Sequence, residues 1–507
     1  MRYVVSTVNK QYKPGLVDGP AGSARFRAPS SVCELPLAAA RRASDAPDQD
    51  KKHAKAAVLV ADTGNNVLRL LLMGNGSQPR NLPMNQHRFR QDSCFLYLTG
   101  CDEPGAALWM DGDRELLLLT PPADDDGLWH GHLTPNAERA ATWGFDQVAD
   151  LDALEGLVGD SRPRTIAVSD PAAGARAAAL AGRPLRFGRE NGDDELIDAL
   201  IRMRRVLSPA ELDATRRTAA ASEFAHRLVM AQTRPGRTEA ALVGLFEGAL
   251  RAHGRLTAYD TILTVRGEVL HNHSHPNTLQ DGQLLLLDGG GEAPDGYAAD
   301  LTRTYPVSGR FDPRQRAAYE AVLEAQTWAI AAARPGVRYR DLHLGACRIL
   351  ARFLVDEGLL RGNVDDLVAE GAHALFFPHG LGHLLGLDVH DLEVFGDRAA
   401  YAPGRARSPQ FGTGYLRLDL DLEEDMLVTI EPGFYVVPAI LQDEALRARF
   451  RHALDLDVAA RWLGFGGIRV EDDVQVRPEG GASLTPQLPR TVDELEALVG
   501  SGGPLPF

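Results

Sequence analysis

Two aspartates near the middle of the chain have the spacing of a metal-binding pair. Asp288 ends an apolar run of four leucines, and Asp300 follows it twelve positions later. The PDG sequence at 294–296 predicts a hairpin turn centred between residues 294 and 295, which would place the two aspartates opposite each other. Facing carboxylates repel, so one must keep its proton unless a cation lies between them. On this segment alone, two solvated turn aspartates are an equally good interpretation.

Two glutamates add to this pattern. Glu431 follows the apolar run MLVTI just before a Pro-Gly pair, and Glu471 follows the strand-like GIRV. A carboxylate at such a place is unfavourable unless it is paired or coordinated. Arg469 lies two residues before Glu471 on the same strand face, where it would orient Glu471 or a neighbouring ligand. The alternative is an ordinary surface pair of Arg469 with Glu471.

Three histidines, His379, His383 and His390, cluster among glycines in FFPHGLGHLLGLDVHD. One neutral imidazole with four carboxylates carries a charge that balances two divalent cations. Oxygen-rich ligation favours Mn²⁺, with Co²⁺ or Zn²⁺ as other occupants. The sequence has no HExxH, GxSxG or GxxxxGK[ST]. A dinuclear metal hydrolase is therefore the chemistry that the residues favour.

The elements that must position these residues fall into two domains. Short apolar runs between turn signals predict an α/β domain with a mixed sheet over residues 56–195. Strands such as QLLLLDGG and MLVTIEPGFYVV alternate with long helices over residues 196–498, which predicts an α+β domain with an antiparallel sheet. We expect residues 1–55 to be a poorly ordered extension and residues 499–507 a tail.

Composition limits the partners. The chain has 507 residues and a net charge of -15, which argues against nucleic acid because phosphate binding requires a basic surface. No apolar run is long enough to span a bilayer and no secretory pattern opens the sequence, so we expect no membrane partner and a cytoplasmic location. The four scattered cysteines indicate reduced thiols.

Together these segments resemble the pita-bread metallopeptidases, the family of methionine aminopeptidase, aminopeptidase P, prolidase and creatinase. The resemblance implies a pita-bread catalytic domain, and HRFRQDSCFLYLTG resembles the creatinase-type N-domain of the proline-specific members. It also implies that the five metal ligands of the family fall on Asp288 (LLLLDGG), Asp300 (ADLTRT), His383 (HGLGH), Glu431 (TIEPG) and Glu471 (GIRVEDD).

The same resemblance implies roles around the metals. Glu431 would be both a ligand and the proton acceptor. His271 in VLHNHSHPN, His379 and His390 would be the substrate-side histidines, of which His379 or His390 would stabilise the oxyanion. Arg417 aligns with an arginine that binds the substrate carboxylate in some prolidases. The alternative is that Arg417 pairs with a neighbouring aspartate, Asp419 or Asp421.

The predicted activity is hydrolysis of the bond between an N-terminal residue and a following proline, in a proline-containing peptide. The alternative is a Xaa-Pro dipeptidase, for which Arg417 is the main indication, and a distant alternative is a pita-bread binding module without catalysis. Relatives commonly assemble as homodimers or homotetramers, and we expect the same here.

Overall fold

The computed structural model describes residues 69–503 apart from 83–84, 113, 124–125, 132–133 and 190, together with two short paired strands, β1 (Val4–Val5) and β2 (Val58–Leu59). It divides into two compact units, the first over Met1–Ala210 with Val394–Gly396 and the second over Glu211–Glu393 with Asp397–Phe507. The predicted extension at 1–55 lies outside the described residues, apart from β1, as do residues 504–507 of the predicted tail.

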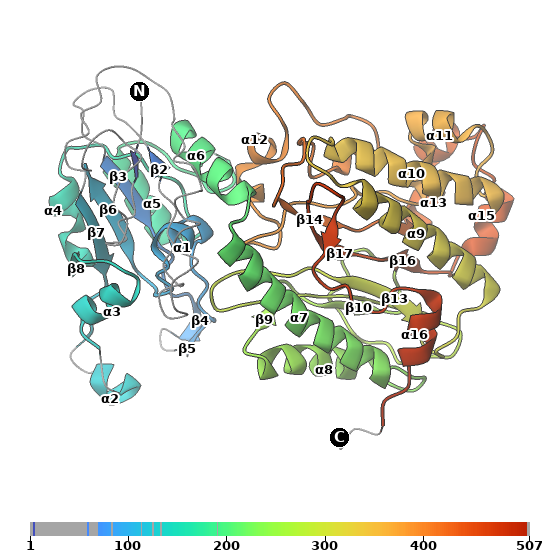
Figure 1. Cartoon of the computed structure of the whole chain (residues 1–507), viewed down its shortest axis with the longest axis horizontal. Helices are drawn as coiled ribbons and strands as arrows, with labels where there is room; N and C mark the ends of the chain where they lie inside the picture. The colour runs from blue at the N-terminus through green and yellow to red at the C-terminus, as the bar shows by residue number, and fades with distance from the viewer. Residues whose placement is uncertain are drawn as a thin grey trace. The chain divides into compact units, whose positions relative to one another are not determined.

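The first unit is built on a four-stranded sheet with the order β3-β6-β7-β8 (Figure 1). Its pairs are antiparallel except β7 with β8, which is parallel, so the sheet is mixed as predicted. The leucines and tryptophan of these strands form its core. The described elements are β3 (Arg69–Met73), β4 (Pro79–Leu82), β5 (Asn85–Gln86), α1 (Ser93–Thr99), β6 (Ala107–Asp111), β7 (Arg114–Leu119), α2 (Asp126–His130), α3 (Asn136–Thr142), β8 (Val148–Asp150), α4 (Leu154–Val158), α5 (Pro171–Ala181) and α6 (Asp194–Arg205).

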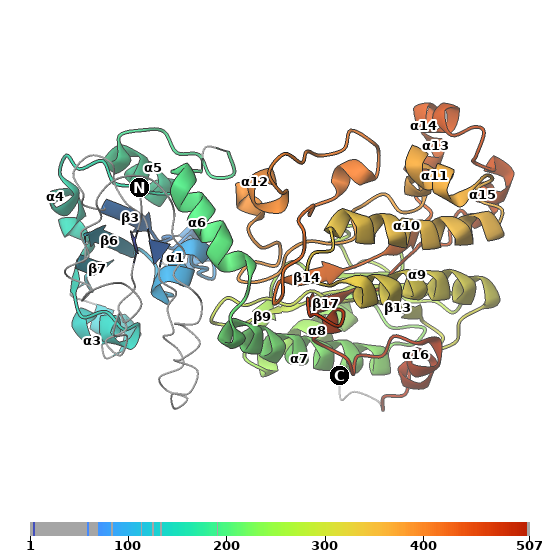
Figure 2. The same ribbon diagram turned by 45° about the horizontal axis from the view of Figure 1, so that its top comes forward.

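The second unit begins within α7 (Pro209–Gln232) and places its strands between two groups of helices. Helices α7 and α8 lie on one side and α9 and α10 on the other (Figures 1 and 2). Burial from both sides explains why β11 is a continuous apolar run rather than an alternating one. All its sheet pairs are antiparallel, as predicted.

The strands of this unit form several small sheets, with the orders β10-β11-β13, β14-β17-β18, β15-β16 and β12-β9. They are β9 (Leu256–Thr257), β10 (Ile262–Thr264), β11 (Leu284–Asp288), β12 (Gly291–Glu292), β13 (Thr302–Pro306), β14 (Leu427–Ile430), β15 (Gly433–Tyr435), β16 (Gly467–Arg469), β17 (Asp472–Gln475) and β18 (Ala482–Ser483). The remaining helices are α8 (Glu239–Ala252), α9 (Pro313–Ala332), α10 (Tyr339–Asp356), α11 (Val364–Glu370), the 3₁₀ turn η5 (Ala372–Leu375), α12 (Asp397–Ala400), α13 (Pro438–Gln442), α14 (Glu444–Arg449), α15 (Leu456–Trp462) and α16 (Val492–Leu498).

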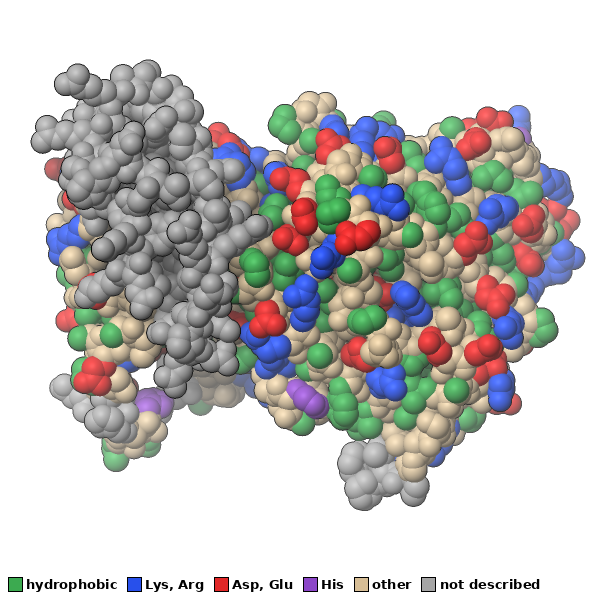
Figure 3. Space-filling model, in the orientation of Figure 1, with side chains coloured by type: hydrophobic (Ala, Val, Ile, Leu, Met, Phe, Trp, Pro, Cys, Tyr) green, Lys and Arg blue, Asp and Glu red, His purple; other side chains and the backbone are tan. Residues whose placement is uncertain are grey.

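Charged side chains of both signs are interspersed over the face of the molecule in Figure 3. Some form exposed ion pairs on the long helices, such as Arg316 with Glu320 at 2.8 Å and Arg352 with Glu324 at 2.6 Å. Such pairs contribute little to stability because water screens them. Among the described residues, no helix is both long and apolar enough to cross a membrane.

Candidate metal centre

Strand β11 ends at Asp288, and the chain returns to β13 just after Asp300. The predicted register is wrong, because Asp288 pairs with Thr302 rather than with Asp300. The Ala293 amide donates to the Tyr297 carbonyl at 3.1 Å, which centres the turn on Asp295, slightly later than the PDG signal suggested. Asp300 still lies on the side of the hairpin that carries Thr302, since side chains two residues apart share a face.

The two aspartates meet at a tyrosine that the sequence did not single out. The Tyr259 hydroxyl lies 2.6 Å from Oδ1 of Asp288 and also within hydrogen-bonding distance of Asp300. Gly290 permits this close hairpin, because a Cβ there would lie 1.7 Å from the Ala299 carbonyl oxygen. The predicted proximity of the two carboxylates therefore holds although their strand pairing differs.

His383 reaches the cluster from a segment that runs beside β14. The Thr429 amide donates to the His383 carbonyl at 2.9 Å, and the Glu431 amide donates to the Leu381 carbonyl at 2.8 Å. The His383 Nδ1–H donates to the Leu384 carbonyl at 2.9 Å, since a carbonyl can only accept. Nε2 is therefore the nitrogen that faces the acids, 3.4 Å from Asp300 and 4.0 Å from Glu431, and a metal ion would replace the proton that it shares with Asp300.

Glu471 enters the cluster beside Thr302, with which it forms an isolated antiparallel bridge. The Thr302 hydroxyl donates to Oε2 of Glu471 at 2.6 Å. Arg469 turns to a neighbouring acid instead, where its Nη2 donates to Asp288 while its Nη1 donates to the Tyr435 hydroxyl at 2.9 Å. Since Arg469 and Glu471 are 4% and 2% exposed, the interpretation of this pair as a surface pair is wrong.

The structure thus brings together all five residues that the sequence indicated. One atom from each of Asp288, Asp300 and Glu471 lies within 4.8 Å of the others, and the same holds for His383, Glu431 and Glu471. Ligand bonds of about 2.0–2.2 Å place donors of one ion at such separations. Two donor sets that share one carboxylate fit two neighbouring divalent cations.

The electrostatics of these acids also fit cations. Burial raises the pKa of Glu431 to about 7 and holds the pKa of Glu471 well above its ordinary value. The pKa of Asp288 is raised by burial too, against the opposing effect of Arg469. Burial alone would raise the pKa of Asp300, but its hydrogen bond with His383 turns the net shift downward. Without cations the cluster therefore retains protons that metal ions would displace.

Two of the three predicted substrate-side histidines, His379 and His390, lie beside the cluster. His379 Nδ1 donates to the Gly380 carbonyl at 2.8 Å and lies 3.7 Å from Glu431, while its Nε2 is 2.9 Å from the Tyr435 hydroxyl. The ring of His390 is centred 4.4 Å from that of His383. Burial lowers the pKa of both His379 and His390 to about 3, so both are neutral at physiological pH.

His271 is exposed, and no described hydrogen bond or ion pair joins it to the four acids and one histidine of the cluster. Partial burial, followed by the charges of Arg469 and Arg417, lowers the pKa of His271. The charge of Asp288, a member of the cluster, acts on His271 in the opposite direction.

Arg417 does not pair with either neighbouring aspartate. Its Nη1 lies 2.8 Å from His390 Nδ1 and donates to Glu393 at 3.2 Å. Asp419 is bound instead by Arg338 at 2.6 Å and Asp421 by Arg405 at 2.8 Å, and Arg405 also lies 3.7 Å from Asp419. The alternative interpretation of Arg417 is therefore wrong, and Arg417 belongs to a small pocket lined by His383, Glu393 and Leu418 among others.

Besides Thr302 and Glu393, sequence reasoning missed three supporting residues. They are Tyr259, Tyr435 and Asp473, whose carboxylate accepts the Asp300 amide at 3.1 Å. Asp473 had a usable signal, because it lies within the buried strand β17, where an acid needs a partner. The two tyrosines carried none, since their hydroxyls reach residues far away in the sequence.

Comparisons with known proteins point the same way. Residues 213–478 match the model of metallopeptidase family M24, and residues 53–164 match that of the aminopeptidase P N-terminal domain. The Xaa-Pro dipeptidase of Homo sapiens is 34% identical over 430 residues, which cover 81% of this chain and 84% of that protein. The Xaa-Pro aminopeptidase of Escherichia coli is 31% identical over 443 residues, which cover 82% and 90%. The structure of Pseudomonas aeruginosa aminopeptidase PepP matches with a TM-score of 0.72 at 30% identity, over 92% of this chain and 99% of that one.

Proposed function

Because the chain belongs to metallopeptidase family M24, we propose that it removes an N-terminal residue that precedes proline, as a Xaa-Pro aminopeptidase. The chain is a metallopeptidase with an aminopeptidase P N-terminal domain and a pita-bread catalytic domain, which confirms the predicted fold class. Relatives of both the aminopeptidase and the dipeptidase kind resemble it at similar identity. The choice between the two activities therefore depends on the site.

The proposed metal ligands are Asp288, Asp300, His383, Glu431 and Glu471, and the proposed metal is Mn²⁺, with Co²⁺ or Zn²⁺ as other occupants. Their carboxylate-rich composition supports a hard or borderline divalent ion. When bound, the two ions polarise the scissile carbonyl and make water acidic enough to act near neutral pH.

The other steps of the proposed reaction, proton transfer and binding of the substrate carbonyl, are assigned to side chains in and around the cluster. Glu431 accepts the proton of the attacking water, a role that suits a carboxylate at the partly open edge of the cluster with a side chain 16% exposed. His379 is held by Gly380 and Tyr435 beside Glu431, which its ring helps to position, and His390 lies at the exposed side, where it can donate to the substrate carbonyl or amide. A pocket can select proline by the shape of its ring, and by its amide, which has no N–H.

The observation that carries the aminopeptidase proposal is the contact of Arg417 with Glu393. A dipeptidase must bind the free carboxylate of proline, and Arg417 is the cation suited to that task. Here its guanidinium already donates to a carboxylate of the protein, at 3.2 Å. A longer substrate needs no such contact, since its proline carbonyl is an amide.

The second candidate, a Xaa-Pro dipeptidase, is favoured by the position of the same arginine. Arg417 lies at the partly exposed edge of the site, in contact with His390, where a proline carboxylate would lie. If such a substrate displaced Glu393, the guanidinium would be available to it.

Assays of Ala-Pro-Ala and Ala-Pro with the Mn²⁺-loaded protein test the proposal. We expect release of alanine from the tripeptide with a kcat/KM at least about tenfold above that of the dipeptide. The factor corresponds to one charge-assisted hydrogen bond, which the carboxylate of the dipeptide would need and which Glu393 already takes from Arg417. A preference for Ala-Pro would favour the dipeptidase. Full activity of both substrates after removal of metal by a chelator would contradict the metal assignment.

The predicted homodimer or homotetramer, the cytoplasmic location and the domain limits at residues 56, 196 and 499 stay predictions. Sedimentation of the purified protein, fractionation of the source cells and limited proteolysis would test them in turn.

A further inference from the structure

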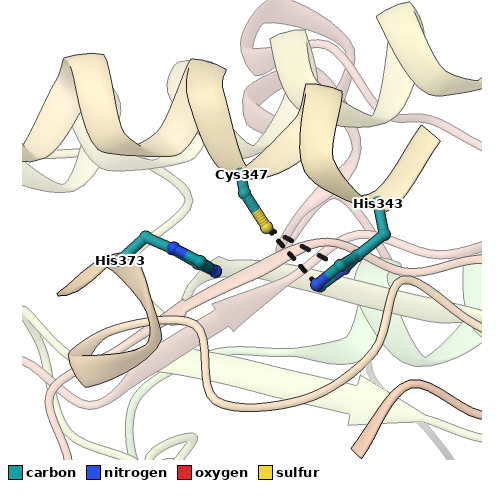
Figure 4. Close-up of side chains that lie close together, drawn as sticks. All are labelled: His343, Cys347 and His373. Carbon is teal, nitrogen blue, oxygen red and sulfur yellow. Dashed lines mark hydrogen bonds between the residues drawn. The ribbon is translucent and has the colours of Figure 1, made fainter. Parts of the chain in front are cut away.

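A second group of metal-binding side chains lies apart from the carboxylate cluster, between α10 and η5. His343 and Cys347 are one helical turn apart on α10, and His373 is in η5. Figure 4 shows the three side chains converging from the two elements. All three are 0% exposed, so no bulk water reaches them.

The separations suit a single ion. Cys347 Sγ lies 3.5 Å from Nε2 and 3.8 Å from Nδ1 of His343. Bonds of about 2.3 Å to sulfur and 2.05 Å to nitrogen place two ligands of one ion about 3.6 Å apart in a tetrahedral site and about 3.8 Å apart in a trigonal one. One nitrogen of His373 completes a set of three atoms within 4.8 Å of one another.

His373 has two buried ring nitrogens that need a partner. Neither of its ring nitrogens makes a hydrogen bond of normal geometry with any residue in the described part of the chain. Buried polar groups nearly always have partners, and an exception needs a physical explanation such as a bound ion. Burial lowers the pKa of His373 to about 4, against a smaller opposing effect of the Leu367 carbonyl, so the ring is neutral and its nitrogen can ligate.

We propose that His343, Cys347 and His373 form a second metal site that takes a soft, thiophilic cation, with Cu⁺ preferred over Zn²⁺. Thiolate and imidazole are ligands for both ions, whereas the carboxylate cluster suits harder ions. On binding, the Cys347 S–H proton leaves to solvent and a sulfur–metal bond forms, with no change in oxidation state.

The charge balance decides between the two ions. With one thiolate, Cu⁺ leaves the buried site neutral, whereas Zn²⁺ leaves one uncompensated positive charge. The cations that act on His343 and Cys347 are Arg340 and Arg348, of which Arg348 is paired with Asp365 at 2.7 Å, and no described carboxylate acts on the three side chains to compensate the excess. Three ligands also satisfy Cu⁺, while structural Zn²⁺ ordinarily has four.

The position of the site gives it a consequence. The chain continues from η5 directly to Phe377 and His379. A bound ion would join α10 to η5 and so fix the start of the segment that carries His379. We expect bound Cu⁺ to raise the melting temperature of the full-length protein, whether or not the protein is a Xaa-Pro aminopeptidase.

The test is an anaerobic competition for Cu⁺ against a chromophoric Cu⁺ chelator, with the full-length protein loaded first with Mn²⁺. We expect wild type to withdraw one equivalent of Cu⁺ per chain and Cys347→Ser to bind it at least about tenfold more weakly. Cys101→Ser is the matched control, because Cys101 is an equally buried thiol in the other unit, and it should behave as wild type.

X-ray absorption at the copper edge of wild type decides the question even if a variant fails to fold. One sulfur and two imidazole nitrogens around the copper would support the site. A shell without sulfur, no withdrawal of Cu⁺ by wild type, or equal binding by folded Cys347→Ser would overturn the proposal. If Zn²⁺ added in excess to the Cu⁺-loaded protein displaced the copper from this site, the charge argument for a monovalent ion would be overturned.

Discussion

Thr302 and Glu471 are joined by three hydrogen bonds, two between their backbones and one from the threonine hydroxyl to the glutamate carboxylate. The backbone pair fixes where Glu471 lies, and the 2.6 Å side-chain bond fixes how its carboxylate is turned. Since Glu471 belongs to both donor sets of the cluster, this contact orients a ligand of both proposed ions.

Thr302→Val should therefore weaken Mn²⁺ binding by about 10–100-fold, the usual cost of removing a partner of a ligand. Isothermal titration of the metal-free protein with Mn²⁺ measures it. Thr304→Val is the control, because Thr304 is equally buried on the same strand but its hydroxyl accepts from and donates to the backbone of Arg469. Equal losses in both variants would mean that the effect is packing rather than orientation.

Glu431→Gln should fold and bind peptide but lower kcat by at least about a hundredfold, by the magnitude of general-base catalysis. Steady-state kinetics on Ala-Pro-Ala with saturating Mn²⁺ provide the measurement. The exposed Glu424, seven residues earlier in the chain, should leave kcat as in wild type when it is changed to Gln. An active Glu431→Gln enzyme would assign the proton transfer to another group.

Glu393→Gln should raise kcat/KM for Ala-Pro by about tenfold and leave Ala-Pro-Ala nearly unchanged. The substitution removes the carboxylate that occupies Arg417, so a substrate carboxylate no longer competes with it. The double variant Glu393→Gln with Arg417→Met should lose that gain. If the gain persisted without the arginine, the carboxylate would have to bind elsewhere.

His226 should make the protein less stable in acid. It is buried, its Nε2 lies 2.9 Å from the Gly289 carbonyl, and burial lowers its pKa to about 4. Between pH 6.5 and 4 the unfolded chain binds a proton that the folded protein does not, so stability falls as pH falls through this window. From pH 7 to 4.5 this residue should account for about 2 kcal/mol of the loss.

Urea unfolding of the metal-free protein at the two pH values checks this, with His226→Gln for comparison. The variant should lose less free energy of unfolding between the two pH values than wild type, whatever its stability at pH 7. Parallel losses in the two proteins would contradict a neutral buried imidazole.

Arg303→Met should lower the free energy of unfolding by about 3–5 kcal/mol. Arg303 and Asp472 form a buried pair at 2.7 Å with side chains 0% and 1% exposed, so removal of the cation leaves a buried carboxylate with only the longer, partly exposed contact to Arg490 at 3.4 Å. Arg352→Met, which breaks only the exposed pair with Glu324, should change stability little. Chemical denaturation measures both, and similar values would show that burial does not protect the inner pair from water.

Asp288, Glu431 and Glu471 could be proposed as ligands from the sequence because each ends or follows a buried strand, where an unpaired carboxylate is unfavourable. Asp300 lies just before β13 and was reached through the hairpin instead. Strand pairing was harder. The PDG signal located the turn, but Gly291 and Glu292 leave to pair with β9, and that departure shifts the register so that Asp288 meets Thr302. Nothing local in the sequence encodes a pairing with so distant a strand.

The partner of Arg417 was out of reach for a related reason. Proximity in the sequence favoured Asp419 and Asp421, but both are bound by other arginines. Glu393, which does bind Arg417, is brought to it by the course of an irregular segment. Loop paths depend on packing of the whole domain, whereas a strand or helix follows from its own residues.

The five proposed ligands come from segments that span residues 288 to 471, and the carboxylate shared by both donor sets is the last of them. During synthesis the acids of the first hairpin leave the ribosome long before Glu471 does. Until then neither donor set is complete, and the growing chain must keep those carboxylates hydrated or protonated. The two proposed ions can therefore bind only after most of the chain has been synthesised. Their sites also need contacts between residues far apart in the sequence, and such contacts form slowly.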